Sequence, residues 1–102
     1  MLSVIIPCRN ESRHIEACVR SILEQKRPLG GMEVIVADGL SDDGTRAILE
    51  ALAKEHPELR VVDNPRRVTP CAMNVGILEA RGQYVAILGA HCDYAADYLK
   101  TC

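Results

Sequence analysis

Ser3-Val4-Ile5-Ile6-Pro7-Cys8-Arg9-Asn10-Glu11 is the stretch that decides the fold, because a short strand-forming run passes directly into polar residues. The same order recurs twice. Val34-Ile35-Val36-Ala37 leads into a polar segment at 38–45, and the run at 84–88 leads into Gly89-Ala90-His91-Cys92-Asp93. In an open parallel α/β sheet, ligands bind at the carboxyl ends of the strands. The pattern therefore predicts a ligand site built from these three polar segments.

Strand-forming runs alternate with amphipathic helical stretches along the chain. We expect strands at 2–6, 34–37, 59–62 and 84–88, with Pro7 ending the first. Helices are expected at about 12–25, 44–55 and 70–81. This alternation indicates an open, Rossmann-like three-layer sandwich, in which a parallel sheet of about four strands carries helices on both faces. The simplest strand order is 3-2-1-4.

Capping residues and apolar stripes set further expectations for the helices. Ser12 is a good N-cap for the first helix, and Asp43 or Ser41 for the second. The spacing of apolar residues predicts which helical positions are buried. For the second and third helices these positions include Ala47, Ile48, Ala51, Leu52 and Leu78.

The order 3-2-1-4 places the first and fourth strands side by side at the topological switch point. A ligand is therefore expected between residues 8–11 and 89–93, with residues 38–43 as one wall. This arrangement supports a nucleotide site. The chain has neither GxxxxGK[ST] nor GxGxxG after its first strand, so ATPase and dinucleotide-binding interpretations are not favoured.

Composition limits the class of protein. The chain has 102 residues, 48% of them hydrophobic, which fits one ordinary domain. A formal net charge of −2, with no Phe or Trp and three Tyr, argues against a nucleic-acid partner. Five cysteines at irregular spacing do not form a disulfide framework, so we expect a reducing compartment, the cytoplasm. No apolar stretch approaches the length of a membrane span.

The three polar segments also carry a family resemblance. The stretch at 3–11 and the stretch at 33–45 resemble the opening of family 2 glycosyltransferases, and Asn74-Val75-Gly76-Ile77 with Ala80-Arg81-Gly82-Gln83-Tyr84 resembles their next signature. The ordered set looks closest to members that build bacterial exopolysaccharides, including the succinoglycan type. The resemblance implies a GT-A fold, with residues 1–102 as its nucleotide-sugar-binding part, truncated before the acceptor-binding half.

What the resemblance implies for activity is transfer of a sugar from a nucleotide-diphosphate donor to a saccharide or lipid-linked acceptor in polysaccharide biosynthesis. The parent protein would work in the cytoplasm or at the cytoplasmic face of the membrane. The general base is expected beyond Cys102, so residues 1–102 alone are expected to bind donor and to catalyse poorly or not at all.

The resemblance also assigns binding roles. Asp38 stands where the family has a carboxylate that holds the nucleoside, while Gly39 replaces an acid common in that motif. The usual DxD positions hold Gly89 and His91, which leaves His91 and Asp93 as candidate ligands for Mn²⁺ or Mg²⁺, with Mn²⁺ favoured by the imidazole. The remaining candidates for donor binding follow the first and third strands, where polar groups and forked arginine donors reach the crevice: Pro7, Arg9, Asn10, Glu11, Arg66 and Arg67.

Each of these assignments has a structural alternative. Asp38 and Asp93 could cap turns, Asp42 and Asp43 are better explained as helix caps, and the arginines could be merely solvated. Glu11 could be a first-turn acid. Two other functions also stay open: a non-catalytic nucleotide- or partner-binding module, and a metal or redox site formed by Cys8, His91 and Cys92. We further expect the outer edge of the fourth strand to favour homo-oligomers.

Overall fold

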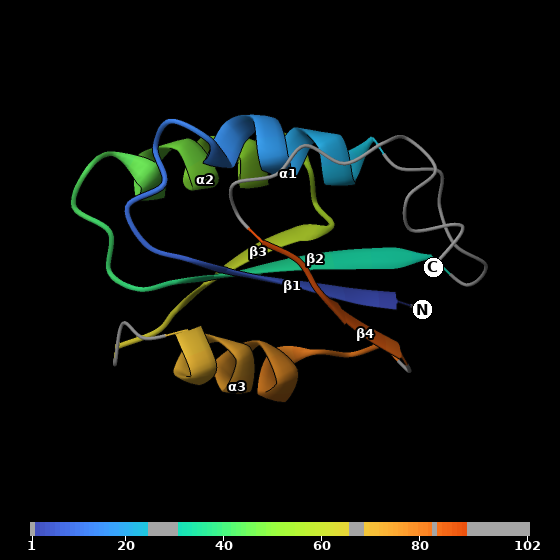
Figure 1. Ribbon diagram of the computed structural model, residues 1–102. Helices are drawn as coiled ribbons and strands as arrows, with labels where there is room; N and C mark the ends of the chain where they lie inside the picture. The colour runs from blue at the N-terminus through green and yellow to red at the C-terminus, as the bar shows by residue number, and fades with distance from the viewer. Residues whose placement is uncertain (1, 25–30, 66–68, 83, 90–102) are drawn as a thin grey trace.

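The protein is described by a computed structural model, which covers residues 2–24, 31–65, 69–82 and 84–89. Four parallel strands form one sheet in the order β3-β2-β1-β4, which confirms the predicted topology. The strands are β1 (Leu2–Cys8), β2 (Met32–Asp38), β3 (Leu59–Asp63) and β4 (Tyr84–Ile87). Helices α1 (Ile15–Leu23) and α2 (Thr45–Glu55) cover one face of the sheet, and α3 (Thr69–Glu79) covers the other (Figure 1).

The two central strands are buried on both faces. β1 and β2 pair in register from Leu2 opposite Met32 to Cys8 opposite Asp38. Val4 and Val34 face α1 and α2 and belong to the main apolar core. Ile5 faces the other way, against Gly76 of α3. Since both faces are covered, each of these strands has a continuous apolar run at its centre, 4–6 in β1 and 34–37 in β2, as is typical of parallel sheets.

The prediction that Pro7 ends the first strand is wrong. β1 continues through Pro7 to Cys8, and Pro7 lies opposite Ala37. The carbonyl of Ile5 accepts the N–H of Leu88 on the β4 side, and the carbonyl of Cys8 accepts the N–H of Gly39 on the β2 side. Because successive residues of a strand direct their backbone groups to opposite sides, the missing N–H of Pro7 lies on the β4 side. Pairing between β1 and β4 ends at Ile5, so the proline removes no hydrogen bond from the ladder.

The first helix begins later than expected. α1 starts at Ile15 with His14 as N-cap, and Ser12 does not cap it. The carbonyl of Glu11 instead accepts the N–H groups of His14 and Ile15, while the N–H of Ser12 donates to Asp43. Contacts to the loop before α2 therefore hold this segment as a turn, and Glu11 lies before the helix rather than in its first turn.

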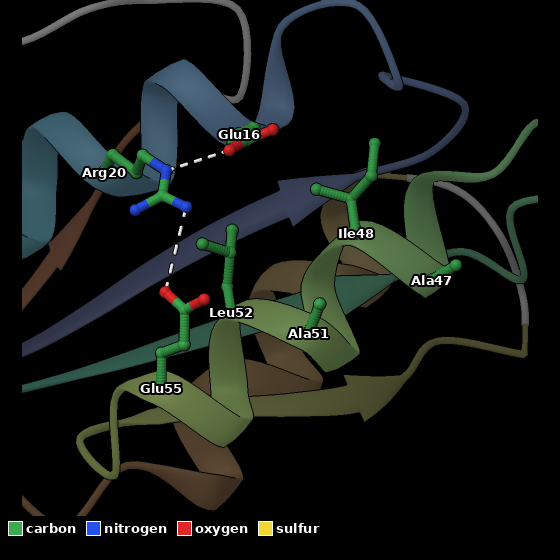
Figure 2. Close-up of a pocket in the computed structure, with 7 residues that line it drawn as sticks. All are labelled: Glu16, Arg20, Ala47, Ile48, Ala51, Leu52 and Glu55. Atoms are coloured by element: carbon green, nitrogen blue, oxygen red, sulfur yellow. Dashed lines mark hydrogen bonds and ion pairs between the residues drawn. The ribbon is translucent and has the colours of Figure 1, made fainter.

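The second helix has its predicted length and buries only part of the predicted stripe, since Leu52 is buried and Ile48 is half-buried. Thr45, Leu49 and Leu52 are buried against the sheet, while Ala47 and Ala51 are exposed. The predicted stripe runs along the side of α2 that is turned towards α1, where it lines a groove (Figure 2). The apolar face of α2 is therefore divided between the sheet and this groove.

A buried carboxylate, Glu33 of β2, holds the loop between α3 and β4. Glu33 of β2 accepts hydrogen bonds from the Ser3 hydroxyl (2.6 Å), the Arg81 backbone N–H (2.6 Å) and the Arg60 guanidinium (3.0 Å). Burial acts to raise the pKa of Glu33, but these hydrogen bonds outweigh it and lower the pKa.

Leu78 of α3, predicted to be buried, is 85% exposed, because α3 lies over β1 and β2 rather than over the edge strand β4. No helix in the described ranges is long and apolar enough to cross a membrane.

Candidate functional site

The candidate site lies at the carboxyl ends of β1 and β2, where the two following loops are joined by hydrogen bonds. The N–H of Asn10 donates to the Ser41 hydroxyl (2.8 Å), and the N–H of Asp42 donates to the Asn10 side-chain oxygen (2.9 Å). The N–H of Glu11 donates to the Thr45 hydroxyl (2.9 Å). Residues 9–12 and 39–45, far apart in the sequence, therefore form one polar surface, which joins two of the three predicted segments. Residues 90–93 of the third segment lie outside the described residues.

Asp38 ends β2 at the base of this surface and is 1% exposed. One carboxylate oxygen, Oδ1, accepts the Ser41 hydroxyl, and the other, Oδ2, accepts the Ser41 backbone N–H (3.4 Å). Arg46 approaches Oδ2 at 3.5 Å. Asp38 thus organises the turn that follows it, as the capping alternative proposed. A ligand donor could reach Oδ1 by replacing the Ser41 hydroxyl.

Arg9 and Leu40 shape the turn after Asp38. The exposed Arg9 side chain donates from Nε to the carbonyl oxygen of Gly39 (3.0 Å), which ties the β1 loop to this turn. Leu40 has a φ of 57°, a left-handed conformation that costs a non-glycine residue about 1 kcal/mol. The turn is held in this conformation by the contacts on either side of it.

Asp43 has a structural role at the start of α2. Its carboxylate accepts the Thr45 backbone N–H (3.1 Å) and hydroxyl, together with the N–H of Ser12 (3.2 Å). The Thr45 hydroxyl is the largest of the causes that lower the pKa of Asp43 to about 2. The N-cap of α2 is Gly44, with no side-chain cap hydrogen bond, so the prediction of Asp43 or Ser41 as N-cap is wrong. Asp43 instead holds the first helical residue, Thr45, from one residue further back, and the neighbouring Asp42 is exposed.

Sequence reasoning missed Arg46 and Asn64. Arg46 pairs with Asp63 at the end of β3 and with Glu50 one turn along α2 (3.2 Å). The buried Asn64 donates its backbone N–H to the Asp38 carbonyl (2.8 Å). One signal could have revealed Arg46, because a cation in the first turn of a helix opposes the helix dipole and needs a carboxylate partner.

Cys8 is buried beside Asp38, and its thiol donates to Asp38 Oδ1 at an S···O distance of 3.8 Å. Burial and the nearby Asp38 charge raise the pKa of Cys8 to about 12. A metal-binding cysteine must be a thiolate, so this environment disfavours the alternative site with Cys8 as a ligand. His91 and Cys92, the other members of that alternative, lie outside the described residues.

Several predicted site residues also lie outside the described part of the chain. They are Arg66, Arg67, His91 and Asp93. Within the described ranges no group of three or more His, Cys, Asp or Glu side chains could hold a metal ion. The described residues alone therefore do not make up the expected divalent-cation site.

Several pockets lined by described residues lie beside the helices. One of about 310 Å³ lies beside Asn64 and the first turns of α3, and one of about 250 Å³ lies over Asn10 and Asp43. The latter is lined by residues of both joined loops. The third, about 320 Å³, is the groove between α1 and α2, where Arg20 reaches Glu16 (2.9 Å) and Glu55 (3.8 Å) across an apolar floor (Figure 2).

The sequence is similar to those of known glycan-biosynthesis proteins. The chain is 40% identical to the succinoglycan biosynthesis protein ExoA of Rhizobium meliloti, over 95% of this chain and 30% of ExoA. It is 34% identical to the dolichyl N-acetyl-alpha-D-glucosaminyl phosphate 3-beta-D-2,3-diacetamido-2,3-dideoxy-beta-D-glucuronosyltransferase of Methanococcus voltae, over 97% of this chain and 32% of that protein. The chain therefore spans about a third of the length of these relatives.

A solved structure agrees with the sequence relatives. The mannosyltransferase PcManGT of Pyrobaculum calidifontis, in complex with GDP-Man and Mn²⁺, superposes with a TM-score of 0.87 at 35% identity, over 96% of this chain and 30% of the other. The four-stranded sheet thus corresponds to part of a GT-A fold. Residues 3–102 also match the family described as Glycosyl transferase family 2. The chain belongs to glycosyl transferase family 2.

Proposed function

We propose that this chain binds the nucleotide-diphosphate sugar donor of a glycosyltransferase at the surface formed by residues 9–12 and 39–45. The observation that carries the proposal is the hydrogen-bonded union of these two loops over Asp38, at the sheet edge where α/β proteins bind ligands. Family membership supports the same ligand class, since PcManGT was solved with GDP-Man.

Each part of the donor has a proposed partner. The Asp38 carboxylate accepts an N–H of the base, in exchange for the Ser41 hydroxyl. We assign Arg9, Arg66 and Arg67 to the diphosphate, because forked guanidinium donors suit phosphate oxygens. Pro7, Asn10 and Glu11 shape the wall of the crevice between them.

We extend the proposal to a divalent cation on the diphosphate, which would neutralise the leaving group. His91 and Asp93 are its proposed protein ligands. The Mn²⁺ in the PcManGT structure supports a cation in this family. Donor binding by this chain should then tighten when Mn²⁺ is added, and replacing His91 with Ala should abolish that dependence.

The complete reaction is proposed from the relatives. ExoA is named for succinoglycan biosynthesis, and the Methanococcus relative is named for transfer to a dolichyl-linked sugar. We therefore propose sugar transfer to a saccharide or lipid-linked acceptor in polysaccharide synthesis, in the cytoplasm or at its membrane face. The relatives are about three times as long as the matched segment. We therefore assign the acceptor-binding site and the general base to a region that corresponds to the unmatched part of these relatives.

A second function, a non-catalytic nucleotide-binding module, shares the binding step and lacks the transfer. Incubation with UDP- and GDP-sugars separates the two, because transfer or donor hydrolysis by the chain contradicts a purely binding role.

Calorimetric titration with UDP and GDP tests donor binding. We expect the wild type to bind at least one of them, and Asp38→Asn to weaken the binding about tenfold or more, because it removes a charged acceptor. Glu55→Gln is the matched control, since it removes a 60% exposed carboxylate at the C-terminal end of α2. If no nucleotide diphosphate binds the wild type, or if Asp38→Asn has no greater effect than Glu55→Gln, the proposal is wrong.

A further inference from the structure

Arg46 connects the ends of two neighbouring strands from the first turn of α2. Its Nη1 group bonds to Asp63 Oδ1 at the end of β3 and lies 3.5 Å from Asp38 Oδ2 at the end of β2. Its Nε group bonds to Glu50 (3.2 Å). The hydrogen bond to Asp63 raises the pKa of Arg46, so the guanidinium stays charged.

The two oxygens of Asp38 have different partners. Oδ1 holds the Ser41 hydroxyl and the weak Cys8 thiol donor, whereas Oδ2 holds the Ser41 backbone N–H and faces Arg46. A hydroxyl rotates away easily, while a backbone N–H and an arginine anchored on a second carboxylate do not. Oδ1 is therefore the oxygen that can be given to a ligand, and Oδ2 the one that keeps the carboxylate in place.

Burial makes the orientation of Asp38 depend on its neighbours. A polar group that is 1% exposed is costly to leave without hydrogen-bond partners. Arg46 is one such partner, and its bonds to Asp63 and Glu50 stop it from turning to solvent. An ionised carboxylate only accepts hydrogen bonds, whereas the protonated acid also donates one.

We propose that Arg46 is a positioning residue that sets base selectivity, because it holds Asp38 as an oriented, acceptor-only carboxylate. This inference rests on the proposed donor-binding function. Uracil N3 and guanine N1 carry hydrogens and can donate to Asp38 Oδ1, whereas cytosine N3 and adenine N1 are acceptors and are repelled. The site thus selects diphosphates of uridine or guanosine over those of cytidine or adenosine.

The test compares affinities within the pairs UDP and CDP, and GDP and ADP, by calorimetry. For the wild type we expect one N–H-bearing nucleotide to bind about tenfold or more tightly than its partner. Arg46→Gln should reduce that preference to within about threefold, mainly by weakening the preferred nucleotide. Arg46→Lys, which keeps the charge, should recover part of the preference, and Glu55→Gln, at the far end of α2, should leave it unchanged.

A purely structural role for Arg46 predicts a different result. It would weaken both members of a pair equally and leave their ratio unchanged, and that outcome overturns the inference. An unselective wild type overturns it as well. If the wild type binds none of the four nucleotides, the proposed function fails and this inference fails with it. Thermal unfolding of each variant identifies those that remain folded at the titration temperature.

Discussion

Replacing Gly76 with Ala is expected to destabilise the protein, although alanine is the better helix former. A Cβ at Gly76 would overlap Ile5 Cγ2 and lie 3.1 Å from its Cγ1 and 3.2 Å from its Cδ1. Ile5 is fully buried in β1, and its branched Cβ restricts rotation about χ1. The side chain therefore cannot move aside without disturbing the central strand.

The magnitudes of the opposing effects decide the sign. Alanine gains about 1 kcal/mol of helix propensity over glycine. Overpacking a buried site costs about 1–3 kcal/mol, and the approach to Cγ2 places this site at the upper end. We expect a net loss of about 2 kcal/mol in the free energy of unfolding, or roughly 8–16 °C in Tm for a domain of this size.

Urea and thermal unfolding measure this loss, and a double-mutant cycle identifies its cause. In the Ile5→Ala background the methyl groups that block the new Cβ are gone, so Gly76→Ala should become neutral or stabilising. Leu78→Ala, at an 85% exposed position of the same helix, should change stability by less than about 0.5 kcal/mol. A more stable Gly76→Ala single variant would refute the reasoning, since helix propensity would then have exceeded the packing cost.

Three further predictions concern a carboxylate, a thiol and the sheet edge. Glu33→Gln should lower the free energy of unfolding by about 1–3 kcal/mol at pH 7. Because folding lowers the pKa of Glu33, the stability difference from wild type should shrink as the pH falls through that pKa. A pH-independent difference in urea unfolding contradicts this. Cys8, whose pKa is raised to about 12, should resist iodoacetamide at pH 8 while the half-buried Cys71 reacts; equal labelling by mass spectrometry contradicts this. Because β4 is an edge strand with unpaired backbone groups, light scattering should show that the wild type self-associates and that Ile87→Lys does so less. A wild type that stays monomeric at high concentration rules out pairing of the β4 edge.

The topology could be predicted from sequence because its signals are local and repeated. Each buried strand is a continuous apolar run, and each run leads into polar residues at the same edge of the sheet. Alternation predicted a parallel sheet, and the simplest doubly wound arrangement of four strands predicted the order that the structure has. The end of β1 could not be predicted, because whether Pro7 is tolerated depends on where β4 stops pairing.

The interior of the site was less predictable, because its side chains bind partners distant in sequence. Ser12 is a favourable N-cap by residue type, but its backbone is held by Asp43 from another loop. Arg46 serves Asp38 and Asp63, and the latter lies 17 residues away. Such pairings depend on how the loops meet after the sheet has formed, and residue spacing alone does not determine them.

The most direct test of the central claim is an NMR titration of the chain with UDP and GDP, with and without Mn²⁺. The account predicts that the largest amide shifts among the described residues occur at 9–11 and 39–45, the two loops joined over Asp38. Shifts centred on Glu16 and Ala51, in the groove between α1 and α2, or no shifts at millimolar nucleotide, would contradict it.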